Sequence, residues 1–460
     1  MTAVLSPPSG APKTAKAPVR PLVSAAPLAP PVLSVGLPLR FVITGLLSLF
    51  TGVVGLVLRP DLLATYHYNQ YIIALTHLFT LGWITSIIMG AMYQLVPAAL
   101  ETKLYSEKLA KWQFMVHLIG FVGMVWMFWT WNVKLVGHFG SIMAIGMGMF
   151  LYNIFRTLKT IPRWNVIAFG IASALFWLTL TMLAGLYVAA AKCWTFSPFD
   201  TVAQMHAHAH LGGVGFFVMM VVGVSYKLVP MFALTELQSE RRARWSIALI
   251  NVGLAGLLVT LLLASPWKLA FAALAVSGLA LYGWEMLAML RARKRRHLDW
   301  GLRYFLTAIS LLAPLSVLAV VLCWPGLPLT VFTGQLENVY GFLALIGVVT
   351  LAILGMLYKI VPFLVWYHSY SRQIGRSKVP ALADLCSTSL QAVTYWMFVV
   401  ALAAVSVATA LSHEAGVKWS CALLAACMAT FAVNIGKILI HFVRPKMEPL
   451  VLPSPLKGNA

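Results

Sequence analysis

Hydrophobic residues fill long stretches of the chain, and polar residues gather in short segments between them. Most stretches are about 20 residues or longer, the length that a helix needs to cross the hydrocarbon of a bilayer. A chain crosses a bilayer as helices or as a closed barrel, and barrel strands alternate and are only about 10 residues long. The pattern predicts an all-α polytopic membrane protein with twelve spanning helices: 37–58, 71–98, 111–131, 134–155, 165–190, 203–230, 245–264, 267–290, 302–324, 336–363, 388–411 and 418–442.

Three of the predicted helices share one sequence pattern. The copies cover residues 77–97, 210–230 and 342–362, about 132 residues apart. Each copy carries a Gly five positions after its first residue, then a second Gly, a Tyr and a final Val-Pro in the same register. We interpret the glycines as helix-packing positions, the tyrosines as an aromatic belt and the prolines as helix ends.

The repeat divides the predicted membrane domain, residues 37–442, into three sets of four helices in a pseudo-threefold arrangement. The sets cover about 37–160, 165–296 and 302–442, and the shared pattern falls on helices 2, 6 and 10. Two copies begin with a histidine, His77 and His210, whereas the third begins with Phe342.

The distribution of basic residues predicts the orientation of the chain in the membrane. The chain is 61% hydrophobic and 10% charged, with a mean hydropathy of +0.87 and a net charge of +21. Basic residues cluster in the loops after even-numbered helices, which by the positive-inside rule places both termini in the cytoplasm. We therefore expect a multi-pass protein of the bacterial inner membrane whose basic loops face anionic lipid rather than nucleic acid. Residues 1–36, rich in Pro and Ala, and residues 443–460 are predicted to be cytoplasmic tails, the first disordered.

In this orientation several histidines lie at one depth near the outer face. His77 lies about 9 Å below the start of its helix. The run from His206 to His210 and the side chain of His138 lie at a similar level, while His67 falls in an outer loop. A titratable ring inside a bilayer is a functional hypothesis by default. For a lone ring such as His117 a hydrogen bond to a neighbouring helix is the simpler explanation.

The run on helix 6 is the densest chemical signal. His206 and His210 share one helix face and His208 points largely the other way, which favours two cofactors on opposite sides of the helix. Imidazole suits haem iron and copper. A zinc site is less expected, because the carboxylates at this depth, Asp200 and Glu337, lie at helix mouths. No C-x-x-C-H occurs, so a haem would be a non-covalent haem b. A helix entrance wetted by water is the alternative explanation.

Twelve helices, cytoplasmic termini, four-helix sets and histidines in the outer third of helices 2 and 6 resemble subunit I of the haem-copper oxidases, especially the C-family catalytic subunit. In looser outline they resemble the NnrS-type haem- and copper-containing membrane proteins. The resemblance implies that His77 is a haem ligand, and that one histidine of the helix-6 run lies where the oxidases bind copper.

The departures from that family concern its active centre. The family has a histidine pair on helix 7, but residues 245–264 contain no histidine. The family also has two histidines on helix 10, where this chain has Tyr340 and Phe342, the counterparts of His208 and His210 in the repeat. Oxygen reduction by the family mechanism is therefore not expected.

The favoured hypothesis is a membrane haem protein that relays electrons or binds a diatomic gas, nitric oxide or oxygen. His77 pairs with one histidine of helix 6, above all His210, to bind a b-type haem near the outer face. His206 or His208, with His138, holds a second haem or copper. A periplasmic cytochrome or cupredoxin would be the electron partner. A copper-handling or solute transporter and a non-catalytic subunit of a respiratory complex remain open as alternatives.

Groups that carry protons are scarce in the predicted spans. Glu285 is the one carboxylate well inside a span, near the cytoplasmic end of helix 8. We expect it to pair with Arg291 or Arg293 rather than to begin a proton path, and proton pumping is not predicted.

Overall fold

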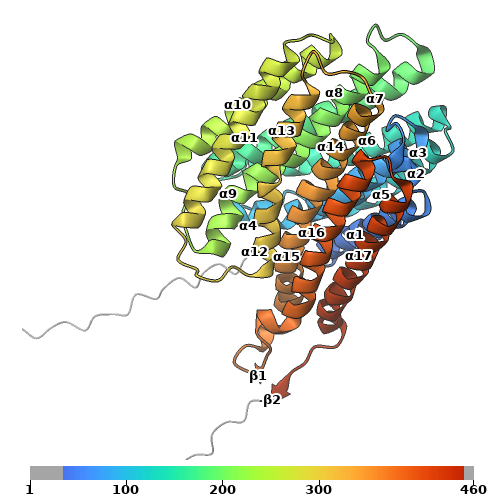
Figure 1. Ribbon diagram of the computed structural model, residues 1–460. Helices are drawn as coiled ribbons and strands as arrows, with labels where there is room; N and C mark the ends of the chain where they lie inside the picture. The colour runs from blue at the N-terminus through green and yellow to red at the C-terminus, as the bar shows by residue number, and fades with distance from the viewer. Residues whose placement is uncertain (1–34, 450–460) are drawn as a thin grey trace, which may run out of the picture. The chain divides into compact units, whose positions relative to one another are not determined.

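The fold of this chain is a bundle of long helices that run roughly parallel to one another (Figure 1). A computed structural model describes residues 35–449, so the predicted N-terminal tail and most of the C-terminal tail lie outside the described residues. Twelve helices are long and apolar enough to cross a membrane: α1 (Gly36–Leu58), α3–η1–α4 (Gln70–Ala99), α5 (Glu107–Trp129), α6 (Val133–Leu158), α7 (Val166–Trp194), α8–η2–α9 (Thr201–Ala233), α10 (Glu240–Leu262), α11 (Lys268–Arg291), α12–α13 (Trp300–Leu322), α14–η3–α15–η4 (Val331–Gln373), α16 (Thr388–Ala410) and α17 (Glu414–Val443).

Shorter elements connect the spans. Helix α2 (Asp61–Ala64) lies between the first two spans, and the 3-10 turn η5 (Leu382–Leu385) precedes α16. Strand β1 (Ser377–Lys378) pairs antiparallel with β2 (Glu448–Pro449). The predicted all-α class with twelve spans is confirmed, and the ends of the predicted spans agree within five residues except for the end of the tenth.

The prediction that these prolines end their helices was wrong. Pro97, Pro230 and Pro362 all lie inside their helices, and the third helix continues to Tyr370. Membrane helices tolerate proline because neighbouring groups satisfy the freed backbone. The extension of the third helix is held by its contacts, since the Tyr370 hydroxyl lies 2.7 Å from Nδ1 of His441.

The three helices that carry the shared pattern are the inner helices of the bundle. In their most apolar windows 61%, 72% and 72% of the residues are buried, against 22–44% in the other nine spans within residues 35–449. Burial of this extent makes them the innermost of the twelve spans within the described residues. The grouping of the spans into three sets of four stays a prediction.

The second glycine of each copy is a packing position, as predicted. A Cβ added to Gly90 would lie 2.6 Å from the Cβ of Phe41, and one added to Gly223 would lie 2.8 Å from the backbone carbon of Gly170. A Cβ on Gly355 would lie 2.5 Å from a backbone oxygen of α12. Each inner helix therefore packs closely on the first span of its own set.

The tyrosines of the shared pattern are not an aromatic belt, which corrects the prediction. Tyr93 is buried and donates to Oε1 of Gln113 at 3.1 Å. Tyr226 is buried and shares a hydrogen bond of 2.7 Å with Ser246. Because these side chains point between helices rather than toward an interface, they bond polar residues of neighbouring spans.

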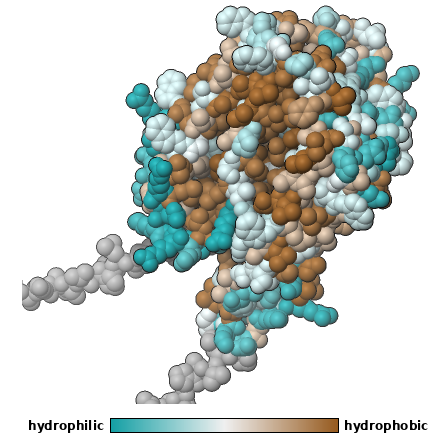
Figure 2. All heavy atoms as spheres, in the orientation of Figure 1, coloured by the Kyte–Doolittle hydropathy of each residue, from teal (hydrophilic) through white to brown (hydrophobic). Residues whose placement is uncertain are grey.

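The outward surface is apolar, as a lipid environment requires. Large side chains such as Trp126, Leu183 and Trp396 are exposed on the helices. Hydrophobic residues cover much of the face seen in Figure 2, and hydrophilic residues gather at its margins. Together with the twelve apolar helices, this surface identifies a multi-pass membrane protein.

Candidate cofactor and metal sites

The polar chemistry of the bundle gathers where its three inner helices begin. We call this region the histidine end and define it by α3 (Gln70–His77), α8 (Thr201–His210) and α14 (Val331–Phe342). Each of these helices passes directly into a π-helical segment: η1 (Leu78–Thr85), η2 (Leu211–Val218) and η3 (Leu343–Thr350). The three π-segments begin at the same position of the repeat. Long π-helical segments are rare and recur at functional sites, so their shared position marks the histidine end.

His77 and His208 face each other at this end. Their ring centroids lie 6.4 Å apart and their planes differ by 16°. Nδ1 of His77 donates to the carbonyl of Ile73 at 2.7 Å, which leaves Nε2 as the nitrogen with a free lone pair. A backbone acceptor on the other ring nitrogen is the usual arrangement of a metal-binding histidine.

The surroundings of His208 also favour a ligand. Its Nδ1 is buried and makes no hydrogen bond within the described part of the chain. A Cβ added to Gly185 would lie 3.0 Å from Cε1 of His208, so glycine leaves the room that the ring occupies. A buried polar atom without a partner costs free energy, and an unseen ligand or water is its usual explanation.

His210 takes part in a different contact. Its Nδ1 donates to the carbonyl of His206 at 2.7 Å, and its Nε2 lies 3.4 Å from the Tyr340 hydroxyl. The rings of His210 and Tyr340 stack at 5.9 Å. The structure therefore brings His77 next to His208, whereas the expected partner His210 contacts Tyr340. Alternate residues of α8 point to opposite sides, and it is the side of His208 that faces α3.

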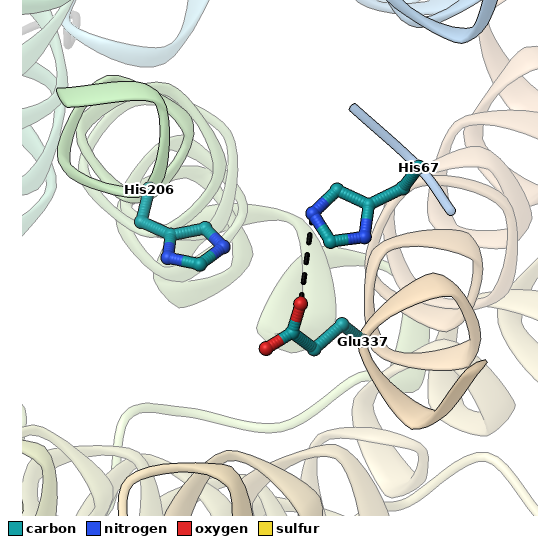
Figure 3. Close-up of side chains that lie close together, drawn as sticks. All are labelled: His67, His206 and Glu337. Atoms are coloured by element: carbon teal, nitrogen blue, oxygen red, sulfur yellow. Dashed lines mark ion pairs between the residues drawn. The ribbon is translucent and has the colours of Figure 1, made fainter. Parts of the chain in front are cut away.

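His206 meets two residues that were not among the predicted ligands. Its ring stacks on that of His67 at 6.0 Å. One ligand atom from each of His67, His206 and Glu337 lies within 4.8 Å of the other two. Figure 3 shows the three side chains directed toward one shared space, with an ion-pair contact between His67 and Glu337. The sequence placed His67 in a loop and Glu337 at a helix mouth, and no local pattern links the two.

His138 does not join this group. It is exposed on α6, and its Nδ1 donates to the Lys134 carbonyl of its own helix at 2.7 Å. No contact among residues 35–449 connects it with His206 or His208. The predicted copper set of His206 or His208 with His138 is thus not assembled, because shared depth does not make two side chains face each other.

Two other buried polar side chains have a bonded partner within the protein. Nε2 of His117 lies 2.9 Å from the Ser86 hydroxyl, the hydrogen bond to a neighbouring helix that was expected. Glu285 pairs with Arg242 at 2.8 Å, so the predicted partners Arg291 and Arg293 were wrong. Helix α10 packs along α11 and carries Arg242 to the carboxylate.

Outside the spans, burial lowers the pKa of the His67 imidazole below its ordinary value. The cause is desolvation, which disfavours the charged ring. His67 is therefore a neutral imidazole near neutral pH, the form that binds metal ions.

Comparisons with known proteins show which class of protein the chain resembles. Residues 33–134 match the family described as cytochrome c and quinol oxidase polypeptide I. A solved heme-copper terminal oxidase dimer has a similar fold, with a TM-score of 0.59 and 13% identity over 92% of this chain and 84% of that chain. The predicted resemblance to the haem-copper oxidase subunit I-like superfamily is confirmed.

A curated relative narrows the likeness to one part of the chain. The bacteroid cytochrome c oxidase subunit 1 homolog of Bradyrhizobium diazoefficiens is 32% identical over 124 residues, which cover 20% of this chain and 23% of the relative. The matched stretch therefore spans about a quarter of that relative's length. The family match covers His67 and His77 but not the helix-6, helix-7 or helix-10 positions where the oxidases bind their other ligands.

Proposed function

We propose that this chain is a haem-binding membrane redox protein on an oxidase-like fold, with His77 and His208 as the ligands of one haem. The observation that carries the proposal is the separation of 6.4 Å between the two rings. A bond between a metal and an imidazole nitrogen is about 2 Å long, so rings at this separation leave room for one metal atom that both would hold. The small angle between the rings is compatible with this arrangement.

The residues around the pair support the same conclusion. The Ile73 carbonyl holds the Nδ1 proton of His77 and orients the ring. Gly185 leaves the space that His208 fills, and the ring of Phe128 stacks on His77 at 4.7 Å. A bound haem would supply a one-electron redox centre.

We favour electron transfer over gas binding, because His77 and His208 would both be used to hold the haem, which would supply a one-electron redox centre. Oxygen reduction is not proposed. Helix α10 carries no histidine, and Tyr340 and Phe342 stand where the oxidases have helix-10 ligands. On this proposal the protein lies in a bacterial inner membrane with cytoplasmic termini. The histidine end then faces the periplasm, where a cytochrome or cupredoxin would deliver electrons.

Absorption spectra of the purified full-length protein, expressed with a haem supply, test the proposal. We expect one non-covalent haem b per chain with a low-spin spectrum that sharpens on reduction and does not shift when nitric oxide is added. His77→Ala and His208→Ala should abolish the low-spin spectrum, whereas the matched controls His210→Ala and His138→Ala should keep it.

Three results would contradict the proposal. Protein that binds no haem after expression with a haem supply would remove it. A low-spin spectrum that is kept in His208→Ala and lost in His210→Ala would show that His210, and not His208, is the second haem ligand. A shift of the reduced spectrum on addition of nitric oxide would show an open axial position and would favour gas binding over electron transfer.

A further inference from the structure

A second site lies beside the His77–His208 pair and does not depend on a haem. It consists of His67 from the loop between α2 and α3, His206 from α8 and Glu337 from α14. Each residue comes from a different third of the chain, and none is the counterpart of another in the repeat. The bundle alone brings them together, with one ligand atom from each within 4.8 Å of the others (Figure 3).

The backbone around the three side chains is well anchored. Nδ2 of Asn338, the residue after Glu337, donates to the Thr65 carbonyl at 2.7 Å and so ties α14 to the loop that carries His67. The same loop is closed by Asn69, whose backbone amide donates to the His67 carbonyl at 3.0 Å. The Asp200 side chain caps the first turn of α8. Supported loops of this kind preorganise a ligand set.

The carboxylate of this group has no hydrogen-bonded cation in the described residues. The Glu337 carboxylate has His67 as its ion-pair partner, at 3.6 Å. That distance is too long for a hydrogen bond. A half-buried anion normally has a bonded cation, so the carboxylate oxygens are available to bind one.

His67 also has a buried ring nitrogen without a hydrogen-bond partner. Nδ1 of His67 is inaccessible to solvent and finds no hydrogen-bond partner among residues 35–449. The group thus offers two imidazoles and one carboxylate, with one ligand atom from each within 4.8 Å of the others. Such a set accepts a cation that takes both nitrogen and oxygen ligands.

We propose that His67, His206 and Glu337 form a binding site for a divalent transition-metal ion of the Zn²⁺ or Cu²⁺ type. Two imidazoles with one carboxylate is the ligand set of open zinc sites, in which a fourth position is left for water or a substrate. Mg²⁺ and Ca²⁺ prefer all-oxygen sites and are not expected to bind here. The sequence made a zinc site less expected because Glu337 lies at a helix mouth, and it gave no sign that Glu337 meets two histidines.

Metal titration of the full-length protein in detergent tests the site. Protein stripped with a chelator is titrated with Zn²⁺ alone, and bound metal is counted by elemental analysis. We expect one tight equivalent in the wild type. Loss of a single ligand, in His67→Ala or Glu337→Gln, should weaken binding by a factor of at least about 10. His138→Ala, an exposed histidine off the site, is the matched control and should bind as the wild type does.

Electron paramagnetic resonance with Cu²⁺ as the probe gives a readout that a structural role would not change. The spectrum should report two nitrogen ligands in the wild type and one in His67→Ala. Lys268→Gln is a further variant, because Lys268 acts electrostatically on both Glu337 and His206. Removal of that positive charge should tighten Zn²⁺ binding.

Several outcomes would overturn the proposal. The first is wild-type protein that binds no equivalent of Zn²⁺. The second is Glu337→Gln protein that binds Zn²⁺ as tightly as the wild type. The third is a Cu²⁺ spectrum of His67→Ala that reports as many nitrogen ligands as that of the wild type. Unfolding midpoints of the metal-free variants show that lost binding does not come from lost folding. Haem spectra measured on the same samples separate this site from the His77–His208 pair, because Glu337→Gln should leave them unchanged.

Discussion

Glu285 and Glu337 are two carboxylates in spanning helices, and their surroundings are opposite. Glu285 is fully buried and accepts hydrogen bonds from the amides of Gln238 and Ser239, at 2.6 and 2.9 Å. It also pairs with Arg242. Glu337 is about one-third exposed and has only the 3.6 Å contact with His67 among the described residues. The first carboxylate is hydrogen-bonded to a cation of the protein, whereas the second has no hydrogen-bonded cation among the described residues.

The difference separates a structural role from a binding role. A buried charge is retained when the protein itself compensates it, and it then joins elements together, as Glu285 joins α11 to α10 and the loop before it. A charge that the protein leaves uncompensated, next to neutral imidazoles, is compensated by something else. Loss of Glu285 should therefore affect stability, and loss of Glu337 should affect binding.

The largest expected effect is that of Glu285→Ala. Removal of this carboxylate leaves the Arg242 guanidinium and two backbone amides without their acceptor. We expect a loss of about 2–4 kcal/mol in the free energy of unfolding, measured by denaturant titration in detergent. The matched control is Glu240→Ala, whose exposed pair with Arg244 should contribute less than about 0.5 kcal/mol. Equal effects of the two variants would refute the structural role of Glu285.

Metal should stabilise the protein through Glu337 and not through Glu285. At a free Zn²⁺ concentration of 100 times the dissociation constant, binding to the folded state alone adds about 2.7 kcal/mol. The unfolding free energy of the wild type should rise by this amount and fall back when a chelator removes the ion. Glu337→Gln should show no rise at the same concentration. A rise of the same size in that variant would place the ion elsewhere.

A similar comparison, with smaller expected effects on stability, can be made between two histidines. Nδ1 has no partner in the described residues in either His117 or His208, but Nε2 of His117 lies 2.9 Å from the Ser86 hydroxyl. In haem-free protein, His117→Leu should destabilise the fold by about 1–2 kcal/mol, because it removes a satisfied buried hydrogen bond. His208→Leu should stay within about 1 kcal/mol of the wild type. Thermal unfolding of both variants measures the contrast, and the reverse order would contradict it.

The smallest expected effect is that of Glu337→Gln in metal-free protein. The amide keeps the shape of the side chain and removes a charge that the protein does not compensate. We expect a change of less than about 0.5 kcal/mol in the unfolding free energy, of either sign. A loss comparable to that of Glu285→Ala would show that Glu337 is part of the structural framework.

Much of the fold was predictable because it depends on local patterns. Apolar length determines where a helix spans a bilayer, and this rule located all twelve helices. The shared pattern identified the inner helices, since close packing there requires glycine at fixed positions, as at Gly223 against Gly170. The prediction about proline failed because it considered only the hydrogen bond that proline removes from its own helix. The free-energy cost of that loss depends on whether neighbouring groups satisfy the freed backbone.

The candidate sites were predictable only in part. The sequence by itself determined that histidines lie at one level near the beginning of helices 2 and 6, because depth follows from residue count along a helix. Only the tertiary structure decided that His77 faces His208, and that His206 meets His67 and Glu337. Those contacts depend on how each helix is rotated about its axis. They also depend on the loop that carries His67, whose conformation cannot be predicted from a periodic sequence pattern. Packing of the whole bundle sets both, and residue spacing along one helix carries no information about the helix opposite it.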